Sequence, residues 1–175
     1  MLRCVAAIAL TPVMLTAQVP AITMATAPAD GSAEAEVVAV ATAALTAITA
    51  GDWTRLTDLM VPESQIHVSV QRDGTWAHRM RTREAERGNT GARPLIERGW
   101  DPIVRVAGGM AIAWVPYDIY VDGKWSHCGV DLFTMMRIGS EWKLVGLAYT
   151  VEQPPACRPH PNGAPPGTTG TPGAP

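Results

Sequence analysis

Residues 99–150 read GWDPIVRVAGGMAIAWVPYDIYVDGKWSHCGVDLFTMMRIGSEWKLVGLAYT. Three turn signals divide this stretch into extended runs rich in β-branched and aromatic residues: Gly108-Gly109, Asp122-Gly123 and Gly139-Ser140. Such dipeptides favour tight hairpins, because the primed turns need positive φ angles. The succession therefore predicts four neighbouring strands in one antiparallel sheet.

The spacing around these turns also predicts which residues pair across the strands. If each turn has two central residues, Asp118 lies opposite His127, and Asp131 lies opposite Trp114 and Ala148. One face would then carry two carboxylates and an imidazole among tryptophans. Bulges are expected where Pro or Gly interrupts a strand, at Pro116, Gly129 and Gly146.

The other predicted face is almost free of charge away from the strand ends. It combines Ala111, Ala113, Val115, Tyr117, Ile119, Cys128, Val130, Leu132, Thr134, Val145, Leu147 and Tyr149. A sheet that is apolar on both faces is covered on both, so we expect helices on one face and a partner subunit or a chain segment on the other. Phe133, Met135, Trp142 and Leu144 are expected in the core under the helices, and Val130, Leu147 and Tyr149 at a dimer surface. The reverse assignment of the faces remains open.

The composition places the chain among single-domain globular proteins. It has 175 residues, a formal net charge of −2 and 47% hydrophobic residues. Nothing in this balance favours nucleic acid as a partner. The arginines nevertheless gather in one region, mixed with glutamates: Arg79, Arg81, Arg83, Arg87, Arg93 and Arg98. A solvated mixed-charge surface is the simpler interpretation, and an anion-binding rim is the alternative.

The N-terminus is typical of an export signal. Arg3 precedes an apolar run, and small residues follow it, which predicts a signal peptide over residues 1–29 rather than a membrane span. We therefore expect a periplasmic or secreted protein that has no membrane segment after cleavage. In an oxidising compartment Cys128 and Cys157 are expected to form a disulfide, with two free thiols as the alternative.

Helices and a second hairpin precede the long strands in a domain expected over residues 30–152. Ser32 and Asp52 are candidate N-caps of two helices, and Thr82 to Arg87 is a candidate third. In the hairpin around Asp73-Gly74, His67 and His78 share one side. No third ligand has recognisable spacing, so no metal site is predicted.

The segment 153–175 consists mainly of Pro, Gly, Thr and Ala. Such a segment has few large apolar side chains to bury, so its composition predicts a disordered tail.

This order of elements resembles the nuclear transport factor 2-like superfamily, which includes SnoaL-like cyclases, ketosteroid isomerase and scytalone dehydratase. The resemblance rests on Trp53 and on the stretches DIYVDG (118–123), SHCGVD (126–131) and EWKLV (141–145), which look most like an exported bacterial branch with lumazine-binding-type members. It implies an α+β fold in which a cone-shaped, strongly curved antiparallel sheet of about six strands wraps around the N-terminal helices.

The resemblance also implies an apolar cavity with acid-base residues that point into it. Asp118, His127 and Asp131 are the candidate catalytic residues by type and placement. The candidate ligand-binding residues are Trp114, Tyr120, Trp125, Phe133 and Trp142. The chain has no early tyrosine on its first helix, which argues against steroid isomerisation. No cofactor is expected, since the sequence has no Gly-rich phosphate loop, zinc spacing or nucleophile elbow.

Three functions follow from these features. The first is an exported protein that binds a small aromatic or apolar ligand. The second is a cyclase, dehydratase or isomerase-type enzyme in which Asp118 orients His127 as a base, against the alternative that Asp118 and His127 form a purely structural pair. The third is a non-catalytic module that pairs with a second copy through its sheet.

Overall fold

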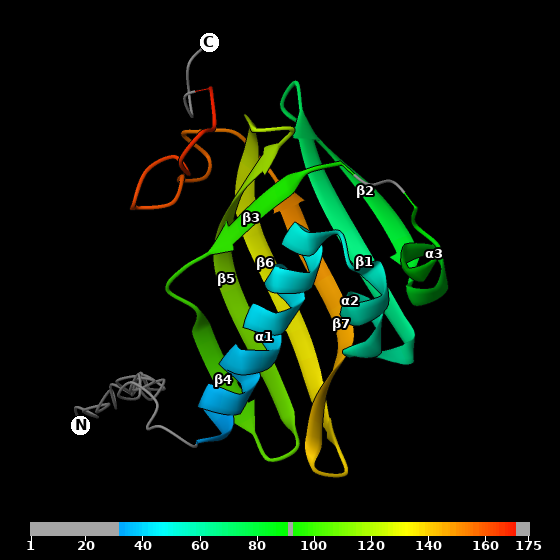
Figure 1. Cartoon of the computed structure of the whole chain (residues 1–175). Helices are drawn as coiled ribbons and strands as arrows, with labels where there is room; N and C mark the ends of the chain where they lie inside the picture. The colour runs from blue at the N-terminus through cyan, green and yellow to red at the C-terminus, as the bar shows by residue number, and fades with distance from the viewer. Residues whose placement is uncertain (1–31, 91–92, 171–175) are drawn as a thin grey trace, which may run out of the picture.

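A computed structural model describes residues 32–90 and 93–170, and the predicted signal peptide lies outside these ranges. The elements follow in the order α1 (Ala33–Ala50), α2 (Trp53–Asp58), β1 (Met60–Arg72), β2 (Thr75–Thr82), α3 (Arg83–Arg87), β3 (Leu95–Gly99), β4 (Ile103–Ala107), β5 (Met110–Val121), β6 (Lys124–Ile138) and β7 (Glu141–Val151). Figure 1 shows one curved sheet with α1 lying diagonally across one of its faces. The predicted α+β class is confirmed.

The sheet has the strand order β2-β1-β7-β6-β5-β3, and β4 also pairs with β5. The sheet has seven strands where an antiparallel sheet of about six is predicted, and it differs from that prediction in two details. First, β1 runs parallel to β7, because the two strands are not joined by a hairpin. Second, the chain bends at Asp101, which has a φ of 42°, so the expected first long run becomes two short strands at opposite ends of β5.

The helices begin where the sequence predicts. The Ser32 side chain accepts a hydrogen bond from the Ala35 amide at 3.2 Å, and Gly51 ends α1 in the left-handed conformation. Asp52 and Thr82 cap α2 and α3 in the same way. By length and composition α1 is apolar enough to span a membrane, but its small residues are buried against the sheet and make it a core helix.

The core lies between α1 and the covered face of the sheet. Ala41, Ala44 and Ala47 let the helix approach closely, and the predicted core residues Phe133, Met135, Leu144 and Trp142 are buried beneath it. Gly99 allows a similar approach in β3, since a Cβ there would come within 2.7 Å of side-chain atoms of Leu45 and Val115. Burial of each large apolar side chain contributes about 1.5–3 kcal/mol.

Two bulges shift the predicted register of the long strands by one residue. On one side of the Asp122-Gly123 turn Tyr120 pairs with Trp125 as expected, but the next pair is Ile119 with His127, so Ser126 is an extra residue. A second bulge, at Val145, lies between β6 and β7. The bulges do not fall at the prolines and glycines where the sequence placed them.

Because of this shift, side chains that are predicted to share a face of the sheet lie on opposite faces. Asp118 pairs with Cys128, not His127, and Asp131 pairs with Val115 and Tyr149. Because side chains alternate along a strand, a one-residue slip moves every partner to the other face. His127 and Asp131 therefore lie on the helix-covered face, whereas Asp118 lies on the outer face. Leu147 and Tyr149, expected at a dimer surface, also belong to the covered side, where both line the cavity under the helices.

The shorter hairpin has the predicted register, with Ser69 opposite His78 and His67 opposite Met80. The His67 Nδ1 and His78 Nε2 atoms are 3.1 Å apart on the exposed outer face. The described residues contain no group of three His, Cys, Asp or Glu side chains that would hold a metal ion.

The segment after β7 folds back over the outer face near the Asp122-Gly123 turn (Figure 1). A disulfide joins Cys128 to Cys157, and the Trp125 amide donates to the Thr169 carbonyl oxygen at 2.9 Å. Residues 153–170 thus take a defined path where composition alone predicts disorder. Cross-linking and backbone hydrogen bonds supply the stabilisation that apolar burial does not.

Candidate functional site

A cavity of about 140 Å³ lies between the helices and the covered face of the sheet. Its walls are mostly apolar and come from the three helices and from six strands, β1, β2, β3, β5, β6 and β7. They are formed by Ile48, Trp53, Leu56, Ile66, Leu95, Ile119 and Leu147, together with Arg81, Glu86, Glu97, Tyr117, His127, Asp131 and Tyr149. An apolar enclosure with a few convergent polar groups is the usual composition of a small-molecule site.

Asp131 is the most deeply buried acid of this cavity, at 2% exposure. Its Oδ2 atom is buried and accepts no hydrogen bond from an N–H or O–H group of the described residues, while the carboxyl group is hydrogen-bonded to that of Glu97. Burial raises the pKa of the Asp131 carboxyl group well above its ordinary value, and the neighbouring Glu97 carboxyl group raises it further. This shift favours the protonated form of Asp131, whose O–H group is a hydrogen-bond donor.

Glu97 supplies the second carboxyl group, from β3. The Thr49 hydroxyl group in α1 holds this residue in place, since it accepts from the Glu97 amide at 3.0 Å and donates to the Glu97 carbonyl oxygen at 3.1 Å. Burial raises the pKa of Glu97 to about 7, while hydrogen bonding to Asp131 opposes that shift. Glu97 is thus the group of the pair that gains and loses a proton near neutral pH.

His127 lies on the same wall of the cavity. The Ser126 Oγ atom is 2.8 Å from its Nδ1, and the ring of Tyr117 meets it edge-on with centroids 5.8 Å apart. Burial lowers the pKa of His127 to about 4, so the imidazole is neutral at physiological pH. A neutral imidazole can accept or donate a hydrogen bond but adds no charge.

Tyrosines and an arginine complete the polar part of the wall. The Tyr117 hydroxyl group donates to the Thr150 carbonyl oxygen at 2.7 Å, which fixes its ring, and burial raises its pKa far above the ordinary value. Arg81 Nε donates to Glu86 at 2.6 Å, and its guanidinium reaches the Tyr149 hydroxyl at 3.4 Å.

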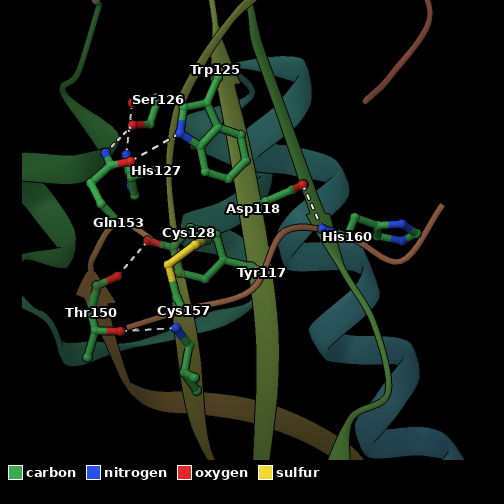
Figure 2. The surroundings of a disulfide bond; sticks show 11 residues. Tyr117, Asp118, Trp125, Ser126, His127, Cys128, Thr150, Gln153, Cys157 and His160 are labelled. Atoms are coloured by element: carbon green, nitrogen blue, oxygen red, sulfur yellow. Dashed lines mark hydrogen bonds between the residues drawn. A yellow bond between two sulfur atoms is a disulfide. The ribbon is translucent and has the colours of Figure 1, made fainter. Parts of the chain in front are cut away.

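Asp118 lies outside this cavity, so the predicted Asp118–His127 pair was wrong. Asp118 is fully buried on the outer face and accepts two hydrogen bonds from Arg98, at 2.9 and 2.6 Å. Figure 2 shows that it also accepts from the backbone amide of His160 in the C-terminal segment, at 2.9 Å. All of this geometry is that of a structural ion pair.

The five aromatic residues predicted to bind ligand do not line the cavity. Trp114 is 45% exposed on the outer face. Tyr120 and Trp125 stack edge-on beside the C-terminal segment, with ring centroids 5.6 Å apart. Phe133 and Trp142 belong to the core under α1.

Sequence reasoning identified His127 and Asp131 in the cavity but missed Glu97, Tyr117, Arg81 and Tyr149 as polar groups of the site. Glu97 was counted among the mixed surface charges, because the strand around it is short and ends at a bend. The sequence gives one indication that Glu97 belongs to the site. Side chains alternate between the two faces of a strand, so Glu97 points to the face opposite that of its neighbours Ile96 and Arg98.

Comparison with solved structures places the fold. An NTF2-like protein from Cytophaga hutchinsonii superposes with a TM-score of 0.55 and 17% identity, over 66% of this chain and 94% of that one. The beta subunit of a candidate aromatic-ring-hydroxylating dioxygenase from Novosphingobium aromaticivorans gives 0.57 at 12% identity, over 69% and 90%. A candidate scytalone dehydratase from the same organism gives 0.53 at 11% identity, over 67% and 83%.

The chain therefore has the nuclear transport factor 2-like fold, as its order of elements predicts. No family model and no curated protein matches its sequence. At such low identities the likeness establishes the fold alone, so function has to be argued from the cavity.

Proposed function

We propose that this protein binds a small, mostly apolar molecule in the cavity, with one polar atom of the ligand hydrogen-bonded to Asp131. The observation that carries this proposal is the buried Asp131 Oδ2 atom without a partner, inside an apolar enclosure. A buried polar atom without a partner costs about 1–3 kcal/mol. A ligand carbonyl or hydroxyl oxygen would remove that cost.

The size of the enclosure sets the size of the ligand. Apolar cavities of about 150 Å³ hold a benzene molecule. Acetophenone, which has one aromatic ring and one carbonyl acceptor, is therefore a suitable probe, and ethylbenzene is its match without the acceptor.

The test is an NMR titration of the ¹⁵N-labelled protein with each probe. We expect acetophenone to bind about tenfold more tightly than ethylbenzene, with shifts at residues of the cavity, because only acetophenone accepts a hydrogen bond. Asp131→Leu should abolish this difference, whereas Asp131→Asn, which keeps a donor, should retain most of it. The proposal would be contradicted if the parent bound acetophenone and ethylbenzene equally tightly, or if Asp131→Leu kept the preference of the parent for acetophenone.

A second candidate function is acid-base catalysis of the isomerase, dehydratase or cyclase type. The specific observation in its favour is that two buried carboxyl groups adjoin in the cavity, Asp131, whose pKa is raised well above its ordinary value, and Glu97, whose pKa is about 7. Such a pair supplies a general acid and a general base at once. Glu97, rather than the predicted His127, would be the base.

Exchange of the acetophenone methyl protons in D₂O tests this candidate. Asp131 would donate to the ketone oxygen while Glu97 removes a methyl proton, so exchange should rise with pH to a plateau with its midpoint near 7. Glu97→Gln should reduce exchange to the buffer rate without preventing probe binding. Exchange at the buffer rate in the parent protein, with acetophenone bound, would leave binding as the function.

We also propose that the outer face of the sheet pairs with a second copy of the chain. This face exposes the large apolar side chains of Ile112, Trp114 and Met80. Light scattering should give twice the monomer mass, and Trp114→Glu should reduce it to the monomer. A parent protein that stays monomeric at high concentration would contradict the pairing. If the protein dimerises but its cavity binds none of the probes, the third predicted function, a non-catalytic dimerisation module, would be favoured.

Export is the last part of the proposal. It is supported by the apolar N-terminal run of the sequence and by the disulfide between Cys128 and Cys157. Expression of the full chain should yield a processed protein that begins near residue 30. An unprocessed chain that starts at Met1 would contradict it.

A further inference from the structure

A second hollow, of about 220 Å³, adjoins the cavity at the open end of the sheet. It is lined by Val68, Val70, Arg72, Arg79, Arg81, His127, Tyr149 and Val151. Arg81, His127 and Tyr149 also line the inner cavity, so the two spaces share a wall. We call the second space the vestibule.

The strand register turns three arginines toward the vestibule. Arg79 lies opposite Val68 and Arg81 opposite Ile66 in the β1–β2 hairpin. Val68 and Ile66 are buried on the helix-covered face, so the arginines opposite them project to that same side. Arg72 follows Val70 by two residues and shares its direction.

These arginines differ from the others of the same region in what they contact. Arg87, Arg93 and Arg98 are each paired with an aspartate that lies outside the vestibule, namely Asp58, Asp122 and Asp118. Within residues 32–90 and 93–170, by contrast, the guanidinium groups of Arg72 and Arg79 have neither a hydrogen bond nor an ion pair, and Arg81 is shared between Glu86 and Tyr149.

Among the residues that the structure describes, no acidic side chain lines the vestibule. The acidic groups Glu86, Glu97 and Asp131 line only the inner cavity, and Glu86 is already bonded to Arg81. The combined space is thus apolar at its inner end, with hydrogen-bond donors and acceptors on one wall, and positive at its mouth.

We infer that the ligand of this protein is an anionic amphiphile, whose ring or short apolar chain enters the cavity while its carboxylate or similar oxyanion binds Arg72 and Arg79 in the vestibule. Guanidinium groups suit this role because they present paired N–H donors to two oxygen atoms. The inference rests on the proposed ligand-binding function and specifies the chemical class of the ligand. Of the arginines that gather in this region of the sequence, Arg79 and Arg81 line the vestibule, so the anion-binding alternative applies to these two and to Arg72.

A matched pair of probes tests it: 3-phenylpropanoate and its neutral amide, 3-phenylpropanamide. Dissociation constants are measured by NMR titration at pH 7.5 and low salt. Because the arginines are solvent-exposed, we expect the carboxylate to bind about fivefold more tightly than the amide, and this advantage should shrink in 0.5 M salt. Inorganic phosphate alone should bind more weakly than 3-phenylpropanoate, since it has no apolar body.

The double variant Arg72→Gln/Arg79→Gln should remove the advantage of the carboxylate and leave binding of the amide unchanged. Arg55→Gln/Arg93→Gln removes the same number of charges from residues that line neither space, and it should keep the advantage. This control separates a local contact from the net charge of the protein.

The possible results distinguish this inference from the proposal beneath it. Equal binding of the two probes, or a carboxylate advantage that persists in Arg72→Gln/Arg79→Gln, would overturn the anionic-ligand inference and leave the binding function intact. Failure of both probes and of acetophenone to bind would contradict the binding function itself. Phosphate binding as tight as that of 3-phenylpropanoate would show an anion site without an apolar subsite.

Discussion

Asp118 on β5 and Asp131 on β6 are both buried carboxyl groups, and they lie on opposite faces of the same sheet. Asp118 accepts two hydrogen bonds from Arg98 and a third from the His160 amide. Asp131 has an oxygen without a partner and a second carboxyl group, Glu97, as its neighbour. The first environment stabilises a charged carboxylate, and the second favours a protonated one.

The comparison shows how burial alone fails to identify a functional acid. A buried charge that is fully paired is part of the framework, because a ligand has nothing to add to it. A buried carboxyl group beside a cavity, with hydrogen-bonding capacity unused, is a candidate site. The two aspartates should therefore respond to substitution in opposite ways.

The largest effect is expected for Asp118→Ala. Removal of this carboxylate leaves Arg98 partly buried without its partner, and breaking such a pair costs about 3–5 kcal/mol. Urea denaturation should show that loss, while the folded fraction should bind acetophenone as the parent does. A loss below 1 kcal/mol would mean that the outer ion pair contributes little.

Removal of the disulfide, whose Cys128 pairs with Asp118 across the strands, should give the next largest loss of stability. Cys128 and Cys157 are 29 residues apart in sequence, and a loop of that length contributes about 3 kcal/mol in the chain-entropy model. Cys128→Ser/Cys157→Ser should lose about this much, and the amides of the C-terminal segment should exchange faster with solvent. Unchanged exchange at those amides would show that the segment is held without the disulfide.

Glu97 should make stability depend on pH in the opposite direction from a salt-bridged acid. Its pKa is about 7 in the folded protein, against an ordinary value of 4.5 for a glutamate, so the folded state binds the proton more tightly. The free energy of unfolding should therefore fall as pH rises from about 4.5 to about 7, by about 2–3 kcal/mol, and stay low above that range.

The measurement is urea denaturation between pH 4.5 and 8.5, compared with Glu97→Gln. His127, whose pKa is lowered to about 4, contributes a slope of the opposite sign between pH 4 and 6.5, and it does so in both proteins. The difference between the two curves isolates Glu97. Parallel curves would contradict its raised pKa.

The smallest effect on stability is expected for Asp131→Asn. The amide replaces a carboxyl group that is already neutral, so the free energy of unfolding at pH 7 should change by less than about 1 kcal/mol. A loss as large as that of Asp118→Ala would show that Asp131 is also a charged framework residue and would end the contrast between the two.

The fold follows from local signals in the sequence, whereas the site depends on single-residue irregularities. Hairpin turns and helix caps depend on particular residue types, such as Asp122-Gly123, Ser32 and Asp52, so the sequence predicts them correctly. The bulges at Ser126 and Val145 have no such signature, because any residue can occupy a bulge of this kind. Since a slip of one residue exchanges the faces, the long strands β5, β6 and β7 were placed correctly, but their side chains beyond the bulges were assigned to the wrong partners.

Glu97 and the C-terminal segment escaped prediction for related reasons. β3 is short and is separated from β4 by a bend, so its alternation extends over too few residues to be recognised. The path of residues 153–170 depends on the predicted disulfide and also on hydrogen bonds of the Thr169 backbone to Trp125 and Gly123 and of the His160 amide to the Asp118 side chain, which composition does not encode. Long-range contacts of this kind are determined by the folded chain, not by local sequence.

The central claim is that Asp131 and Glu97 share the cavity as one protonated and one titrating carboxyl group. Side-chain ¹³C NMR of the labelled protein measures this directly, by following the carboxyl carbons from pH 3 to pH 9. The account predicts that Glu97 titrates with a midpoint near 7 and that Asp131 remains protonated through neutral pH. Midpoints near 4 for both carboxyl groups would contradict it.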